Sequence, residues 1–86
     1  MLEEIQRNFI INLRFLRKKQ EYTQQEIADR LGINRTTYTK WETGVCEPGL
    51  KNIERLCNLL DVDYNTLFQR RILKGLMKIG KRSIKP

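Results

Sequence analysis

The sequence predicts an all-α domain of five short helices followed by a basic C-terminal segment. Apolar residues in the first 68 positions recur at helical spacing, without the alternation typical of a half-buried strand. Clusters of helix-capping residues divide these positions into five segments. A chain of 86 residues has room for one small domain, because the share of surface that a chain can bury falls with its length. We therefore expect a domain at 1–68 and an extension at 69–86.

The first helix is predicted from three apolar residues at i, i+4 and i+7: Phe9, Leu13 and Leu16. The second helix is predicted over 24–31. Thr23 and Glu26 can form a capping box at its start, in which each side chain bonds the other residue's backbone amide. Gly32 can adopt the left-handed conformation that ends a helix, so the second helix should stop at Leu31.

The third helix should begin after Asn34, a capping residue, and run to about Thr43. Only about three residues then separate the second and third helices. Two short helices joined by a tight glycine turn form a helix-turn-helix unit. In the DNA-binding version of this unit, the second helix enters the major groove.

A fourth helix is predicted from four apolar residues at helical spacing: Leu50, Ile53, Leu56 and Leu60. Asp63 can cap a short fifth helix that holds Leu67 and Phe68. Cys57 falls on the apolar side of the fourth helix, where we interpret it as a small hydrophobic residue. Cys46 lies in the preceding loop, and we expect an inert thiol there rather than a redox switch.

The two faces of the helix-turn-helix should differ in chemistry. Five apolar or aromatic residues are expected to face inward: Ile27, Leu31, Ile33, Tyr38 and Trp41. For Tyr38 and Trp41 this favours a core position over stacking on bases. Five polar residues of the third helix remain on the other side: Arg35, Thr36, Thr37, Thr39 and Lys40. Such donors and hydroxyls can read base edges, although the same set could be a solvated helix face.

Several ordered motifs are shared with a known family. They are Leu13–Arg17, Thr23–Asn34, Tyr38–Gly44, Glu47–Pro48 and the end of the fourth helix at Leu60–Val62. On these motifs, residues 9–68 resemble the lambda-repressor-like helix-turn-helix family, also called the Xre or Cro/repressor family. The resemblance implies a five-helix DNA-binding domain with its helix-turn-helix in helices 2 and 3. The chain departs from the family pattern at Tyr38, usually a small aliphatic residue, and at Gly49, usually a serine cap.

The resemblance also implies roles for individual residues. Base contacts are expected from four residues of the third helix: Arg35, Thr36, Thr39 and Lys40. Phosphate contacts are expected from four others, with Gln24 as the clamp at the start of the second helix: Gln24, Asn34, Thr37 and Thr43. Arg17 is implied to pair with Glu42 and so to tie the first helix to the third. The alternatives are an ordinary first-turn Gln24 and a loose surface ion pair.

The whole net charge of +7 belongs to the C-terminal extension. Residues 1–68 hold ten Lys/Arg and ten Asp/Glu, whereas residues 69–86 hold seven Lys/Arg and no acid. On a helical wheel, the apolar residues of 70–80 fall on one arc: Ile72, Leu73, Leu76, Met77 and Ile79. The basic residues fall on the opposite arc. We expect a sixth helix that packs its apolar arc on protein and turns its basic arc to phosphate, with a disordered tail and a membrane-surface helix as alternatives.

Composition excludes several classes of function. The sequence has no histidine, and its two cysteines lie eleven positions apart, so it predicts no metal site, no cofactor and no disulfide. No catalytic constellation is evident, so we expect no enzyme. No run approaches eighteen apolar residues, and the N-terminal segment carries acids where a secretory signal is basic. We therefore expect a cytoplasmic protein that does not associate with membranes.

Together these observations predict a sequence-specific DNA-binding regulator of transcription, a repressor, that reads the major groove with the helix Asn34–Thr43. Its expected partners are double-stranded DNA and a second copy of the chain, with 70–80 as the candidate dimer interface. The alternative is a protein-interaction module on the same fold, such as the antitoxin of a toxin–antitoxin pair.

Overall fold

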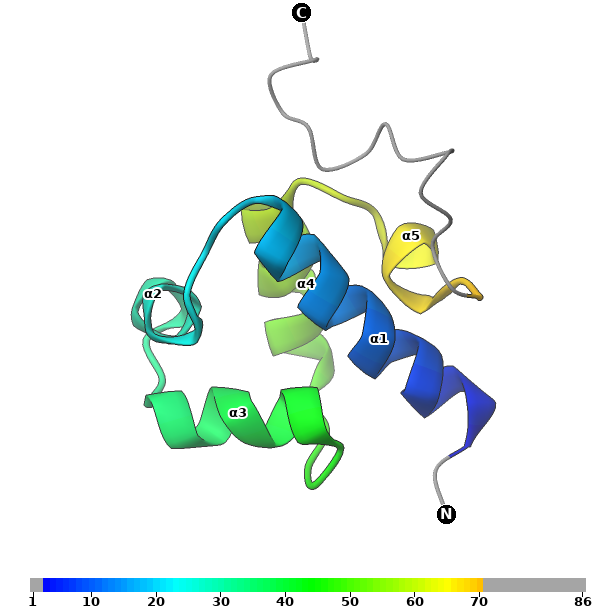
Figure 1. The fold of residues 1–86 in the computed structure, drawn as a ribbon, viewed down its shortest axis with the longest axis horizontal. Helices are drawn as coiled ribbons and strands as arrows, with labels where there is room; N and C mark the ends of the chain where they lie inside the picture. The colour runs from blue at the N-terminus through cyan, green and yellow to red at the C-terminus, as the bar shows by residue number, and fades with distance from the viewer. Residues whose placement is uncertain (1–2, 71–86) are drawn as a thin grey trace, which may run out of the picture.

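A computed structural model describes residues 3–70 and contains five helices, drawn in Figure 1. They are α1 (Glu4–Lys19), α2 (Gln24–Leu31), α3 (Arg35–Thr43), α4 (Leu50–Leu60) and α5 (Tyr64–Phe68). Within 3–70 there is no strand. The predicted all-α fold with five helices is therefore confirmed. The predicted sixth helix at 70–80 lies outside the described residues, apart from Arg70.

The helix boundaries around the turn are those predicted from capping chemistry. Thr23 caps α2, and its hydroxyl accepts a bond from the Glu26 amide at 3.0 Å while the Glu26 carboxylate accepts one from the Thr23 amide at 2.8 Å. Gly32 ends α2 in the left-handed conformation, with φ at 73°. The side chain of Asn34 then caps α3 by accepting a bond from the Thr37 amide at 2.9 Å.

The fourth helix differs from its predicted face at one residue. Gly49 is its cap and offers no side-chain bond, so the first turn of α4 has backbone amides without a capping side chain. Leu50, expected among the apolar residues of this helix, is 83% exposed. Leu56 and Leu60 are fully buried as expected, and Ile53 is half-buried against the core. Leu50 is the first residue of α4 and lies outside the core, whereas Ile53, Leu56 and Leu60 further along the helix pack in it or against it.

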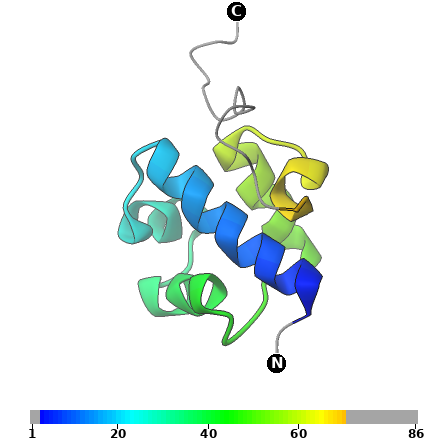
Figure 2. The ribbon, with the colours of Figure 1, turned by 45° about the vertical axis from the view of Figure 1, so that its right-hand side comes forward.

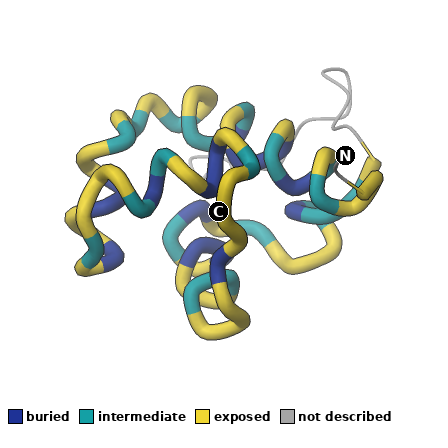
Figure 3. The backbone as a smooth tube through the Cα atoms, turned by 90° about the horizontal axis from the view of Figure 1, so that it is seen from below, coloured by how far each residue is buried: buried dark blue, intermediate teal, exposed yellow. Residues whose placement is uncertain are grey.

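The core is built from all five helices. Helix α1 crosses the domain (Figures 1 and 2), lying in front of α4 in the view of Figure 1, and it packs against α3 and α5, while α4 contacts α2 and α5. Buried and half-buried residues alternate with exposed ones along the described backbone in Figure 3. The buried apolar residues are Phe9, Leu13, Leu16, Ile27, Ala28, Leu31, Tyr38, Trp41, Leu56, Cys57, Leu60 and Leu67. Tyr38, Trp41 and Cys57 thus occupy the core positions predicted for them.

Two side-chain amides, of Asn12 in α1 and of Gln20 directly after α1, bond backbone carbonyls at the C-terminal ends of other helices. Asn12 is fully buried, and its Nδ2 donates to the carbonyls of Leu67 at 3.0 Å and Gln69 at 2.8 Å. Gln20 Nε2 donates to the carbonyl of Leu60 at 2.7 Å. Because the last carbonyls of a helix have no partner within the helix, these two amides anchor α5 and α4 to α1.

Candidate nucleic-acid interface

Helix α3 has one face fixed in the core and one face in solvent. Tyr38, Trp41 and Glu42 are buried. Four predicted contact residues are exposed: Asn34, Arg35, Thr36 and Lys40, and Thr43 at the end of the helix is exposed as well. Thr37 and Thr39 are half-buried at the edge of this surface. The α3 face, as we call the set Arg35, Thr36, Thr39 and Lys40, therefore presents its polar side chains outward on a helix whose other side cannot move freely.

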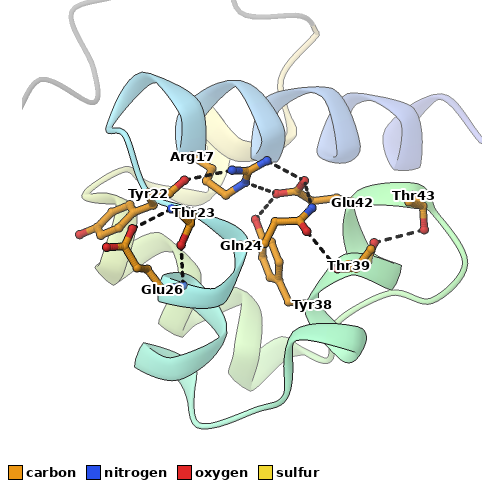
Figure 4. A network of polar contacts seen from close by, with 9 residues as sticks. All are labelled: Arg17, Tyr22, Thr23, Gln24, Glu26, Tyr38, Thr39, Glu42 and Thr43. Carbon is orange, nitrogen blue, oxygen red and sulfur yellow. Dashed lines mark hydrogen bonds and ion pairs between the residues drawn. The ribbon is translucent and has the colours of Figure 1, made fainter.

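The ion pair between Arg17 and Glu42 is present and partly buried (Figure 4). Arg17 Nε lies 2.6 Å from Glu42 Oε2, and Arg17 Nη2 lies 3.2 Å from Glu42 Oε1. The side chains of Arg17 and Glu42 are only 11% and 3% exposed. Arg17 Nη1 also donates to the Tyr22 carbonyl at 3.0 Å, just before α2. The predicted tie between the first and third helices is thus a bidentate bridge and not a loose surface pair.

Glu42 receives two further hydrogen bonds that sequence reasoning did not foresee. The Tyr38 hydroxyl donates to Glu42 Oε2, and Gln24 Nε2 donates to Glu42 Oε1 at 3.0 Å. We call Arg17, Gln24, Tyr38 and Glu42 the Glu42 network. It joins α1, α2 and α3 at one carboxylate whose two oxygens both have partners. The signal was present in the sequence: Tyr38 stands one helical turn before Glu42, and a buried tyrosine hydroxyl needs a partner.

The network fixes the ionisation of its members. Burial alone would raise the pKa of Glu42, but the bonds from Arg17, Tyr38 and Gln24 outweigh burial and lower it from the usual glutamate range. The bond to Glu42 raises the pKa of Arg17 further. Burial, together with the bond to Glu42, raises the pKa of Tyr38. At neutral pH the centre therefore holds a carboxylate, a guanidinium and a neutral phenol.

Gln24 connects this buried network to the α3 face. Its Oε1 accepts a bond from the Thr39 hydroxyl at 3.2 Å, while its Nε2 is held by Glu42. Figure 4 shows the Gln24 side chain between these two partners. Gln24 is half-buried, so it lies at the border between the core and the α3 face. Both ends of its amide are engaged within the domain.

The other predicted phosphate-contacting residues lie around the ends of α3. Asn34 is exposed at the start and uses its Oδ1 for the cap. Thr43 is exposed at the end, and its hydroxyl lies within bonding distance of the Thr39 and Lys40 carbonyls, at 3.2 and 3.4 Å.

Neither a metal site nor a membrane span is found among the described residues. No three His, Cys, Asp or Glu side chains of residues 3–70 lie together so that they could hold a metal ion. None of the helices within 3–70 is long and apolar enough to cross a membrane.

Comparison with known protein families gives a match over most of the chain. The family described as "Helix-turn-helix domain" matches residues 10–71. The chain belongs to this family. The match includes α2, α3 and most of α1, and together with the similarity to bacterial and phage regulators it confirms the predicted lambda-repressor-like, Xre-type membership.

Curated relatives of this helix-turn-helix protein are regulators from bacteria and phages. It is 43% identical over 61 residues to the HTH-type transcriptional regulator YqaE of Bacillus subtilis (strain 168), covering 71% of this chain and 53% of that protein. It is 32% identical over 54 residues to the cryptic phage CTXphi transcriptional repressor RstR of Vibrio cholerae, covering 63% of this chain and 49% of that protein. The chain spans about half the length of the curated relatives it matches.

Solved structures agree on the fold of the helix-turn-helix domain. The solution structure of the SOS-response transcriptional repressor LexA from Eubacterium rectale superposes with a TM-score of 0.75 at 25% identity, covering 83% of this chain and 76% of that one. The crystal structure of the hypothetical transcription factor NHTF from Neisseria gives a TM-score of 0.72 at 25% identity, covering 81% and 83%. The arrangement of five helices is thus shared with transcription factors.

Proposed function

We propose that this protein is a sequence-specific DNA-binding regulator of transcription that acts as a repressor. The observation that carries the proposal is the α3 face. It is polar and exposed, and its helix is locked to α1 and α2 through Glu42. A rigid helix with exposed donors is what major-groove recognition requires, because base edges are read by side chains held in a fixed register. The names of the relatives support the same function.

Individual residues take the roles expected from the sequence. Arg35, Thr36, Thr39 and Lys40 contact bases, and Asn34, Thr37 and Thr43 contact phosphates around the ends of α3. Gln24 contacts a phosphate at the start of α2, where free backbone amides favour an anion, through the second hydrogen of its Nε2, since the first is donated to Glu42. Base contacts supply the choice of sequence, and phosphate contacts supply much of the affinity. No step of this function is catalytic, and its place is the cytoplasm, where bacterial DNA lies.

The regulator binds its operator as a homodimer, with residues 70–80 in the interface. Two facts about the described residues support self-association outside the α3 face. Large apolar side chains are exposed there on α1, α4 and α5: Ile5, Leu50 and Tyr64. A pocket of about 240 Å³ between α1, α4, α5 and the loop after α3 is lined by Phe9, Ile53 and Phe68 among others, close to where residues 70–80 begin.

Selection of bound duplexes from a random pool tests the function directly. A regulator enriches one short sequence and retards it in preference to bulk DNA at matched salt concentration. Enrichment of no sequence, together with stoichiometric co-purification of another protein, would favour an interaction module such as an antitoxin. An Arg35→Ala variant is the comparison: it removes a proposed base contact at an exposed position, so it should enrich a less restricted set of sequences.

A further inference from the structure

We infer that Thr39 can only accept hydrogen bonds from DNA, and that this one-way polarity makes it select an amino-bearing base, adenine or cytosine, over a keto-bearing one. The inference rests on the proposed DNA-binding function and adds to it a determinant of sequence choice. Two hydrogen bonds carry it, from Gln24 to Glu42 and from Thr39 to Gln24, and each has only one possible direction.

The first step is the charge on Glu42. Its pKa is lowered by Arg17, Tyr38 and Gln24 despite burial, so the side chain is a carboxylate at neutral pH and can only accept. The group that faces Glu42 Oε1 from α2, at 3.0 Å, must therefore be a donor. Of the two ends of the Gln24 amide, only Nε2 donates. A flipped amide would place an oxygen against a carboxylate oxygen, so the charge fixes the orientation of Gln24.

The second step follows from that orientation. With Nε2 turned to Glu42, Gln24 Oε1 points to α3 and lies 3.2 Å from Thr39 Oγ1. An amide oxygen has no hydrogen to give, so the Thr39 hydroxyl must donate its single proton to Gln24. What Thr39 has left for DNA is its pair of acceptor sites and its methyl group.

The third step is the pattern of groups in the major groove. Adenine offers the N6 amino group and cytosine the N4 amino group, whereas guanine offers only N7 and O6 and thymine only O4 and a methyl group. An acceptor-only hydroxyl bonds the first two and meets an acceptor on the last two. Thr39 should therefore prefer A or C over G or T at one position of the contacted strand. Gln24 and Glu42 act through Thr39 and are positioning residues.

The first pair of test variants changes Thr39 itself. Thr39→Val keeps the shape and the methyl group but loses the hydroxyl, whereas Thr39→Ser keeps the hydroxyl. Binding is measured on duplexes from the wild-type selection that carry each of the four bases at each position. We expect one position where wild type and Thr39→Ser favour amino over keto bases on the order of tenfold, and where Thr39→Val shows no such preference.

The second pair tests the bond from Gln24. Gln24→Leu leaves the Thr39 hydroxyl free to rotate and donate, so it can also bond keto bases. The ratio of affinities for amino over keto bases should then fall toward one. Gln25→Leu is the matched control, because exposed Gln25 bonds Asp29 on its own helix and does not touch the Glu42 network. If Gln24→Leu merely stops binding a phosphate, affinity falls for all four bases alike and their ratio stays unchanged. Circular dichroism confirms that each variant is folded.

The outcomes separate the inference from the function on which it rests. If wild type enriches a sequence but no position shows an amino preference that Thr39→Val abolishes, the inference fails, while the proposed DNA-binding function still holds. An amino preference retained in folded Gln24→Leu also overturns it, because the polarity would then not come from Gln24. If wild type enriches no sequence at all, both the function and the inference fail. Should Gln24→Leu not fold, the Thr39 pair still decides the matter.

Discussion

Single side chains on α3 are divided between those that hold the helix in the core and those that we propose contact DNA. Tyr38 and Glu42 point inward and are buried, whereas Arg35 and Lys40 on the same helix are exposed. The 3.6-residue period of the helix makes this division possible within nine residues. Substitutions of the two kinds should therefore have separable effects, on stability and on binding.

Arg35→Ala should relax the choice of sequence. Its exposed guanidinium is suited to bidentate bonds with a guanine edge, and removing such a pair of bonds costs about 1–3 kcal/mol on the best site. Binding to random DNA should fall much less. Gel retardation with specific and random duplexes measures both effects, and Arg55→Ala is the control, because Arg55 is an exposed arginine on α4 and not part of the α3 face. If affinity falls equally for specific and random DNA, Arg35 does not contact a base.

Acid should weaken the domain through Glu42. The pKa of this carboxyl is lowered in the folded state, so it stabilises the fold at pH values above its usual pKa of 4.5, and this stabilisation disappears as the pH falls through the lowered folded value. Glu42→Gln should therefore be less stable than wild type at pH 7, and the difference should shrink below pH 4.5. Urea unfolding at several pH values measures it. A constant difference down to pH 2 would contradict the assignment.

Helices as units are joined by polar side chains as well as by the apolar core. Glu42 joins α3 to α1 and α2, and Asn12 and Gln20 anchor α5 and α4 to α1. These contacts are buried or partly buried, so removing one partner leaves a polar group that has lost its bond and has limited access to water. The long α1 therefore positions α3 although it contributes none of the proposed DNA contacts.

A double-mutant cycle should detect the link between α1 and α3. Arg17→Met and Glu42→Gln should each destabilise the domain by about 3 kcal/mol, because each leaves a buried or partly buried partner uncompensated. Their coupling should exceed about 1 kcal/mol. Arg55 and Asn52 supply the comparison, as an exposed pair on α4 at 3.3 Å whose coupling should be at most about 0.5 kcal/mol. Coupling no larger than in that pair would reduce Arg17 and Glu42 to a surface contact.

At the scale of the whole molecule, the net charge lies in residues 69–86, whereas the proposed base contacts lie in the domain that precedes them. Residues 1–68 have no net charge, so they gain little long-range attraction to DNA, and the +7 of residues 69–86 is where electrostatic steering would arise. A monomer would also read a short site with a single helix. A homodimer presents two α3 faces to half-sites about 34–36 Å apart, which lengthens the sequence that is read.

Deleting residues 70–86 should have two separable effects. The protein should change from dimer to monomer in sedimentation, because the apolar arc at 70–80 is removed. The salt slope of DNA binding should also decrease by about 0.9 for each phosphate that the shortened chain no longer neutralises. A variant that replaces only the basic residues of 69–86 with glutamine should remain a dimer while its slope decreases. If the truncated chain sediments like the full one, residues 70–80 are not the dimer interface. If the salt slope of DNA binding is unchanged, the deleted segment does not contact DNA phosphates.

The sequence by itself determined the elements and the fold. The capping box at Thr23, the glycine at 32 and the cap at Asn34 fixed the boundaries of α2 and α3, because these signals are local and depend on a few neighbouring residues. The pairing of Arg17 with Glu42 came from the family resemblance, since periodicity says nothing about which helices meet. The roles of the DNA-contacting residues stay predictions.

Only the tertiary structure decided how the helices share their polar groups. That Tyr38 and Gln24 both bond Glu42, and that Gln24 then bonds Thr39, depends on three helices meeting at one carboxylate. The exposure of Leu50 likewise depends on where the packed surface of α4 ends, although its spacing matched that of the buried leucines. Spacing along a helix places a residue on a face, but the neighbouring helices decide whether that part of the face is covered and what its polar atoms bond.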